Sequence, residues 1–284
     1  MPSSAVNEVV RWLVRAVKGY IAHQSANQAS SVAFAWVLAM FPLLAMVSAA
    51  AAYVGEPGTV AELVDRVLDY APKIVGDTLR PAIDQVLRER NRAVLALGTV
   101  GTVWAASSGM QAVRTALNRA YGVEQGLAFW QARIKVTLFT LVFSTVALAA
   151  FASVVVMPYL LDIAQRASSG ELTTARWLDT GVRYGAAWIA LVLAYAALYG
   201  LLPDIRQRVR TVVPGALIGA TLWIAIAFLL VHSLRRASDL VIVYGGLAGV
   251  VATLVFMYLS AATLIFGAEI NGAIRHDSGA QTAQ

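Results

Sequence analysis

A carboxylate, Glu269, and an amide, Asn271, stand in the mostly apolar segment LSAATLIFGAEINGAI at residues 259–274, where Glu269 is the one charged residue. A carboxylate in such a segment either pairs with a basic group that joins it to a neighbouring helix or takes part in gating. On a helix, Asn271 lies roughly 200° from Glu269, so the two side chains do not form one site. We expect Glu269 to pair with a basic residue near Asn118–Arg119 or Arg206–Arg210 as a structural clamp, with gating as the alternative.

The sequence offers few residues for enzymatic chemistry. It contains no cysteine, and its three histidines, His23, His232 and His276, are far apart in the chain. The metal motifs HExxH and CxxC, the nucleophile motif GxSxG and the phosphate-binding motif GxxxxGK[ST] are all missing. We therefore expect no catalytic residue, no metal, no cofactor and no ATP hydrolysis by the chain itself.

Prolines and glycines mark positions where helices bend or approach one another. Pro42 lies inside AMFPLLAM, where its missing N–H should kink a helix, and Pro203 follows a long apolar run. Small residues recur at the spacing of close helix packing in two places. These are Gly215 with Gly219 and Gly245 with Gly249. We expect packing within the chain at both, with a homodimer interface as the alternative.

Composition indicates a membrane protein, because 59% of the residues are hydrophobic, 13% are charged and the mean hydropathy is +0.68. A helix needs roughly twenty apolar residues to cross a bilayer. Six stretches qualify: residues 31–54, 93–113, 134–161, 182–202, 211–232 and 246–268. The sequence therefore predicts an all-α, polytopic membrane protein with six transmembrane helices.

Three further segments complete the predicted domain organisation. Residues 1–30 should form an amphipathic helix, because Val10, Leu13 and Val17 follow one face while Arg11, Arg15 and Lys18 follow another. We expect this helix to lie on the membrane surface, with partner binding as the alternative. Residues 55–92 should form an outer loop of two short helices. The six-helix domain should extend over residues 31–274, and residues 275–284 should form a disordered cytoplasmic tail.

The basic residues set the expected orientation. The segment after the second span carries Arg119, Arg133 and Lys135, and the loop after the fourth span carries Arg206, Arg208 and Arg210. Because short basic loops stay inside, we expect both termini in the cytoplasm. These six residues should bind anionic lipid headgroups or act only as topological anchors. The full set of binding or gating candidates is Pro42, Asn118, Arg119, Tyr121, Arg133, Lys135, Pro203, Arg206, Arg208, Arg210, Tyr244, Glu269 and Asn271.

Five stretches in order resemble the YihY/BrkB family of bacterial inner-membrane proteins, whose members often carry the mistaken label ribonuclease BN. They are VAFAWVLAMFPLL, ALNRAYGVE, FWQARIKV, PGALIGATLW and YGGLAGVVATLVFMYLSAATLIFGAEINGA. The sequence departs from the usual family pattern at Phe34 and Ala35, at Gly200 and at Phe256. The resemblance implies a six-helix protein of the bacterial inner membrane with cytoplasmic termini and a role related to transport or envelope integrity.

From these observations we expect a protein that transports or handles a lipid or another anionic amphiphile. Its partners should be membrane lipids, with no nucleic acid. The alternative from another class is a scaffold that transports nothing and recruits envelope partners. A membrane-bound ribonuclease has no support in the residues, since they provide no metal-ligand set.

Overall fold

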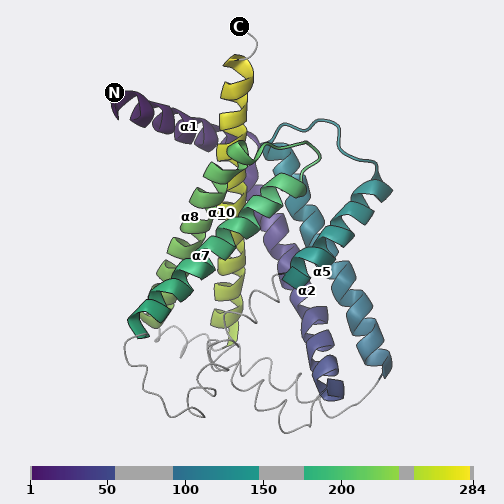
Figure 1. The fold of residues 1–284 in the computed structure, drawn as a ribbon. Coiled ribbons are helices and arrows are strands. Elements are labelled where there is room, and N and C mark those ends of the chain that lie inside the picture. The colour runs from purple at the N-terminus through teal and green to yellow at the C-terminus, as the bar shows by residue number, and fades with distance from the viewer. Residues whose placement is uncertain (1, 55–91, 147–175, 237–245, 282–284) are drawn as a thin grey trace. The chain divides into compact units, whose positions relative to one another are not determined.

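The computed structural model describes residues 2–54, 92–146, 176–236 and 246–281, and their regular structure is helical (Figure 1). The labelled helices are α1 (Pro2–Ala22), α2 (Ser25–Val54), α5 (Arg92–Ala120), α7 (Arg176–Leu201), α8 (Val209–Arg236) and α10 (Gly246–Gln281). A further helical stretch without a label, residues 129–146, lies between α5 and α7 in the chain. The all-α prediction is confirmed for these residues. The predicted outer loop at 55–92 lies outside them, apart from Arg92.

Each of the six predicted spans overlaps one of these helices. Within the described residues, two helical stretches are long and apolar enough to cross a membrane, Val209–Ser233 in α8 and Gly249–Arg275 in α10. A shorter apolar stretch, Gly185–Leu201, lies in α7. The presence of apolar spans is thus confirmed, whereas their number of six stays a prediction.

The boundary between the first two helices differs from the prediction. We expected an N-terminal helix to residue 30 and a span from residue 31, but α1 ends at Ala22 and α2 begins at Ser25. The break lies at Gln24, whose φ of 53° falls in the left-handed region that ends a helix. The backbone carbonyl of Gln24 then accepts hydrogen bonds from Asn27 and Gln28, which starts α2.

The far end of α10 is also different from the prediction. A disordered tail was expected from residue 275, whereas α10 continues to Gln281. The expectation of disorder is therefore wrong for residues 275–281. The polar residues Arg275, His276 and Asp277 end the apolar run but do not break a helix, since they can extend it in water.

A glycine ends α5 by a defined mechanism. Gly122 has φ 67°, its N–H donates to the carbonyl of Arg119, and the N–H of Val123 donates to the carbonyl of Asn118. This pair of bonds is the Schellman arrangement, which satisfies carbonyls at a helix end. The chain consequently turns sharply after α5 and leads into the helical stretch at 129–146.

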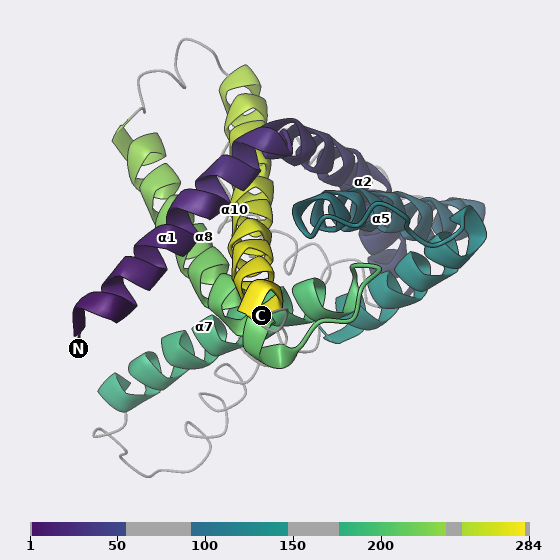
Figure 2. The same cartoon turned by 90° about the horizontal axis from the view of Figure 1, so that it is seen from above.

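The chain divides into two compact units, and the first comprises Met1–His23, Leu117–Leu222 and Thr263–Gln284. In this unit α1 crosses α10 (Figure 2). The core at the crossing is formed by Ala16 of α1 with Ile270 and Ile274 of α10, and by partly buried neighbours. These neighbours are Trp12, Ile218 and Phe266. The first unit therefore joins the N-terminal helix to the C-terminal one.

The second unit comprises Gln24–Ala116 and Trp223–Ala262. Here α2 runs through Pro42 as one helix, and a Cβ placed on Gly101 of α5 would lie 3.4 Å from Cβ of Pro42. The indole N–H of Trp223 in α8 donates to the hydroxyl of Ser260 in α10 at 2.9 Å. The predicted kink at Pro42 stays a prediction.

Candidate functional site

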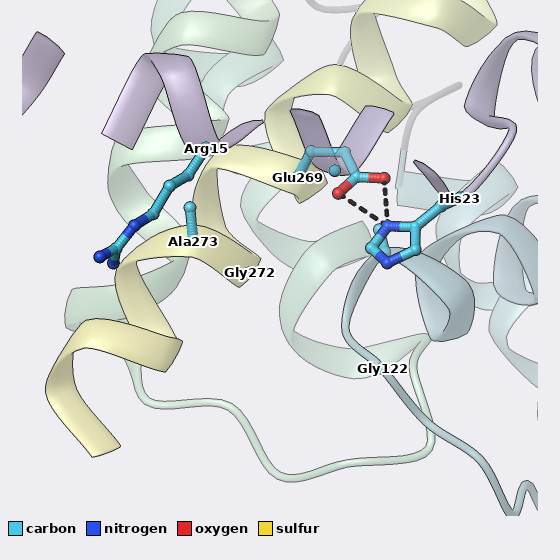
Figure 3. Close-up of a pocket in the computed structure, with 8 residues that line it drawn as sticks. Arg15, His23, Gly122, Glu269, Gly272 and Ala273 are labelled. Atoms are coloured by element: carbon cyan, nitrogen blue, oxygen red, sulfur yellow. Dashed lines mark hydrogen bonds and ion pairs between the residues drawn. The ribbon is translucent and has the colours of Figure 1, made fainter. Parts of the chain in front are cut away.

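Glu269 is buried in the first unit and contacts a histidine from the other end of the chain. Its side chain is 3% exposed, and Nδ1 of His23 lies 2.9 Å from Oε1 and 3.1 Å from Oε2 (Figure 3). An ionised carboxylate only accepts hydrogen bonds, so with Glu269 ionised Nδ1 of His23 is the donor. The contact joins α10 to the residue that follows α1.

This partner corrects the sequence prediction. We expected an arginine from the segments near Asn118–Arg119 or Arg206–Arg210, and the structure places His23 against Glu269 instead. The reason is the crossing of α1 over the face of α10 that carries Glu269, where the rings of Tyr20 and Phe266 also meet at 6.1 Å. The histidine that contacts Glu269 therefore comes from the residue that follows α1.

Glycine makes the approach of Glu269 to α1 possible. A Cβ on Gly19 would lie 2.6 Å from Oε2 of Glu269, which is closer than real Cβ atoms come. A Cβ on Gly272 would likewise lie 2.7 Å from the backbone oxygen of Ala120. A side chain at Gly272 would push the end of α5 away from α10, whereas one at Gly19 would displace the carboxyl group of Glu269.

A small hollow of about 220 Å³ surrounds the pair (Figure 3). Its walls come from α1, the end of α5 and α10, and they consist of Arg15, Gly19, His23, Ala120, Gly122, Glu269, Gly272 and Ala273. Arg15 extends past Ala273 and away from the contact between His23 and Glu269 (Figure 3). The hollow thus combines one carboxylate, one imidazole and one guanidinium with five small residues.

Asn271 occupies a separate buried site on the other side of α10, as its angular separation from Glu269 predicts. Its Oδ1 accepts from the backbone N–H of Gly215 at 2.8 Å, and its Nδ2 donates to the carbonyl of Val212 at 3.1 Å. Nδ2 also lies 3.4 Å from the hydroxyl oxygen of Tyr121. Asn271 therefore fastens the beginning of α8 to α10.

Burial raises the pKa of the Tyr121 hydroxyl above its ordinary value, and the hydrogen bond from Asn271 lowers it by a smaller amount. Tyr121 follows α5 and lies outside the apolar spans. The hydroxyl thus stays protonated at neutral pH. It can accept from Asn271 without adding a charge to the buried contact.

A second polar contact joins the end of α5, the 129–146 helix and the end of α7. Asp204 has a side chain only 2% exposed and accepts from Nδ2 of Asn118 at 3.0 Å. The N–H of Asp204 donates back to Oδ1 of Asn118 at 2.9 Å. Nζ of Lys135 lies 3.3 Å from Oδ1 of Asp204 and donates to the carbonyls of Leu202 and Pro203. Lys135 thereby satisfies carbonyls just after α7.

The structure separates the predicted candidates into groups. Asn118, Lys135 and Pro203 meet around Asp204, whereas Tyr121 and Asn271 meet beside Gly215. The other candidates follow: Arg119, Arg206, Arg208 and Arg210 are exposed, Arg133 and Pro42 are partly buried, and Tyr244 lies outside the described residues. Glu269 stands apart from both groups with His23.

The glycine candidates pack within the chain where the structure describes them. A Cβ on Gly215 would overlap the carbonyl oxygen of Gly267 and the carboxamide of Asn271. A Cβ on Gly219 would lie 2.9 Å from the hydroxyl of Tyr199. Gly249 is buried, and Gly245 lies outside the described residues. Gly215 and Gly219 thus lie against other helices of the same chain, and the roles predicted for the glycines, including a homodimer interface, stay predictions.

Sequence reasoning missed His23 and Asp204. His23 continues the spacing Trp12, Ala16, Gly19 along the face of α1 that packs on α10, so helical periodicity could have found it. Asp204 is the one acid in the basic loop PDIRQRVR and directly follows a proline. Among the described residues, no three His, Asp or Glu side chains gather as a metal site would require.

Comparison with known proteins identifies the family of this sequence. A sequence model of the family described as "Virulence factor BrkB" matches residues 16–284. The chain is 26% identical over 261 residues to the "Putative ribonuclease-like protein YfkH" of Bacillus subtilis (strain 168), covering 90% of this chain and 92% of that protein. It is 23% identical over 253 residues to the "UPF0761 membrane protein" of Halorhodospira halophila, covering 89% of this chain and 54% of that protein. No solved structure matches.

Proposed function

The chain belongs to the virulence factor BrkB family, and from this premise we propose that it is a protein of the bacterial inner membrane that handles an anionic amphiphile such as a lipid. In this proposal it crosses the membrane six times and keeps both termini in the cytoplasm. It uses no ATP of its own and catalyses no covalent reaction.

Exposed apolar side chains support the membrane location. Phe228 and Leu229 of α8 are 74% and 63% exposed, and Leu193 of α7 is 63% exposed. The 129–146 helix exposes Ile134 and Leu138 to 68% and 62%. Apolar surface on this scale requires an apolar environment, and in a protein with spans of this length the environment is the acyl chain region.

The observation that carries the lipid proposal is the contact between Asn118 and Asp204. Its two reciprocal hydrogen bonds hold the end of α5 against the loop between α7 and α8. Both segments carry exposed arginines, one beside Asn118 and three in the loop. These are Arg119, Arg206, Arg208 and Arg210. Each basic residue near an anionic leaflet contributes about 1 kcal/mol of attraction, so the four together bind and orient anionic headgroups.

The test is lipid movement across vesicles that contain the purified protein. Fluorescent lipids with anionic, zwitterionic and neutral headgroups should cross faster than in empty vesicles, and anionic lipids should cross fastest. Replacing Arg206, Arg208 and Arg210 with Gln should slow the anionic lipids selectively. The matched control is Arg235→Gln with Arg236→Gln, which removes charge at the other end of α8.

Two outcomes would contradict the proposal. No movement above empty vesicles for any headgroup would remove transport and favour the scaffold alternative, which a pull-down under gentle detergent would then test. The printed name of the Bacillus subtilis relative also motivates an RNA cleavage assay with magnesium or zinc. If the purified chain cleaves RNA, and the variant that lacks Arg206, Arg208 and Arg210 cleaves it equally well, the protein is an enzyme instead.

A further inference from the structure

Helix α1 has three distinct faces, of which one is already used for packing. Trp12, Ala16 and Tyr20 face α10, and Ala16 is completely buried there. Gly19 lies on the same side against Glu269. This face accounts for the contact of α1 with the rest of the first unit, and it leaves most of the helix circumference for another partner.

The second face is apolar and exposed. At about 100° per residue, its five members fall within a stripe roughly 100° wide. They are Val10, Leu13, Val14, Val17 and Ile21, with exposed fractions of 52%, 36%, 49%, 47% and 72%. Leaving five large aliphatic side chains in water costs free energy in proportion to their area. A continuous stripe of this kind therefore indicates an apolar partner.

The third face is basic and adjoins the apolar stripe. Arg11, Arg15 and Lys18 occupy a sector roughly 60° wide on the same wheel, and all three residues are exposed. Lys18 stands closest to the apolar stripe, about 40° from Val14. An apolar stripe bordered by cations matches the boundary between acyl chains and anionic headgroups.

The position of α1 relative to α10 also fits a location at the boundary between acyl chains and headgroups. The apolar stretch of α10 ends at Arg275, and Glu269 lies six residues before it, roughly 9 Å along the helix. His23 fixes the end of α1 at that level. From there α1 crosses α10 at a steep angle in both views (Figures 1 and 2). A helix that crosses a span near its end lies along the membrane surface.

We propose that α1 lies in the headgroup layer of the leaflet at which α10 ends, with its apolar stripe among acyl chains and its basic stripe on anionic headgroups. The proposal rests on the membrane location proposed above. A second copy of the chain fits the surface less well. A symmetric contact between two α1 helices through this stripe would bring their cationic borders together and cause repulsion.

The chain has no cysteine, so single-cysteine variants report on α1 without background labelling. Val14→Cys and Val17→Cys probe the apolar stripe, and Glu8→Cys is the control, at an exposed residue outside that stripe whose carboxylate lies 4.0 Å from the guanidinium of Arg11. Each full-length variant is labelled with an environment-sensitive fluorophore and placed in vesicles with or without phosphatidylglycerol. Lipids with quenchers at known depths in the acyl chains then report the position of the label.

With phosphatidylglycerol, labels at residues 14 and 17 should emit at shorter wavelength and be quenched several-fold more than the label at residue 8. Combining Arg11→Gln, Arg15→Gln and Lys18→Gln should reduce this quenching, and so should removal of phosphatidylglycerol. Labels at 14 and 17 that stay in water would overturn the proposal. If the labels at 14 and 17 are shielded from water only at high protein-to-lipid ratio, and become exposed when the protein is diluted in lipid, a second copy of the chain covers the stripe and the proposal is overturned.

The same vesicles separate this proposal from the proposed function. Flotation with lipid after alkaline extraction measures insertion of the spans, and fluorescent lipid movement measures transport. If the protein inserts and moves lipid while labels at 14 and 17 stay in water, only the inference about α1 fails. If α1 is embedded while no lipid moves, only the transport proposal fails.

Discussion

At the residue scale, the contact between His23 and Glu269 joins groups 246 positions apart in the chain. Glu269 is nearly fully buried, whereas the side chain of His23 is 37% exposed. The imidazole therefore serves as the hydrogen-bond donor that a buried carboxylate needs, and it remains open to solvent on one side. The contact stabilises the packing of α1 on α10, because a buried carboxyl group needs hydrogen-bond partners and His23 supplies one.

His23→Ala should lower the free energy of unfolding by about 1–3 kcal/mol, because it removes the hydrogen bond between His23 and the buried carboxyl group of Glu269. Adding Glu269→Gln to this variant should recover part of the loss, since a neutral amide is less costly to bury. Thermal unfolding in detergent measures both changes. His232→Ala is the control, because that exposed histidine stacks on Phe228 within one helix.

The prediction about His23 would be wrong if His23→Ala and His232→Ala had the same effect. It would also be wrong if the double variant were as unstable as the sum of its single changes. Either result would mean that the carboxylate of Glu269 gains nothing from the imidazole.

The role of Glu269 could be predicted from sequence better than its partner could. A single charge close to the end of a long apolar run indicates an ion pair at the membrane boundary. The choice between His23 and the loop arginines depends on where α1 crosses α10, and local sequence does not contain that information. Asp204 was missed for a similar reason, because its burial depends on Asn118 and Lys135 from two other elements.

At the element scale, small residues let the helices of the first unit approach closely. Gly215 of α8 and Gly267 of α10 face one another, and a Cβ on Gly267 would lie 2.7 Å from the carbonyl oxygen of Gly215. The hydroxyl of Tyr199 in α7 donates a hydrogen bond to the carbonyl of Leu264 in α10, with the two oxygens 2.7 Å apart. The three helices are therefore held by close backbone contacts and hydrogen bonds, which supply specificity where lipid weakens the hydrophobic effect.

Gly215→Ala should destabilise the fold by about 1–3 kcal/mol, because the added methyl group overlaps the backbone of α10 and the side chain of Asn271. Gly185→Ala in α7 is the matched control. A Cβ there meets no heavy atom within 4 Å, so alanine should be neutral or slightly stabilising. Thermal unfolding of both variants compares them directly, and equal stability would contradict the close approach of α8 and α10.

The helices could be located from sequence, whereas their ends could not. Each predicted apolar run overlaps a helix, because roughly twenty consecutive apolar residues are the length of helix that crosses a bilayer. The true ends depend on local backbone features such as Gln24 and Gly122, whose positive φ angles interrupt the helices. Polar residues that continue a helix, as beyond Arg275 in α10, add no apolar signal to the sequence.

At the scale of the whole molecule, six spans would place both termini and two connecting segments on one side of the membrane. Single cysteines added to the cysteine-free chain test this arrangement with a reagent that does not cross membranes. Cysteines at Ser3, Glu124 and Gln207 should react from the cytoplasmic side. Cysteines at Glu56, Ser168 and Ser238 should react from the opposite side.

Right-side-out and inverted vesicles provide the two directions of labelling, and labelling after detergent treatment shows that every cysteine is reactive. A reversed pattern would preserve six spans and invert their orientation. Reaction of Glu56→Cys and Glu124→Cys from the same side would contradict the span assigned to residues 93–113.

The long separation between His23 and Glu269 also has a consequence for synthesis of the chain. A ribosome adds roughly 5–20 residues per second, so His23 emerges some 12–50 s before the carboxylate that it will contact, 246 residues later. During that interval α1 has neither its core neighbours Ile270 and Ile274 nor the side chain of Glu269 that contacts His23. The docking of α1 therefore waits until α10 has been synthesised, because α10 supplies all of these neighbours.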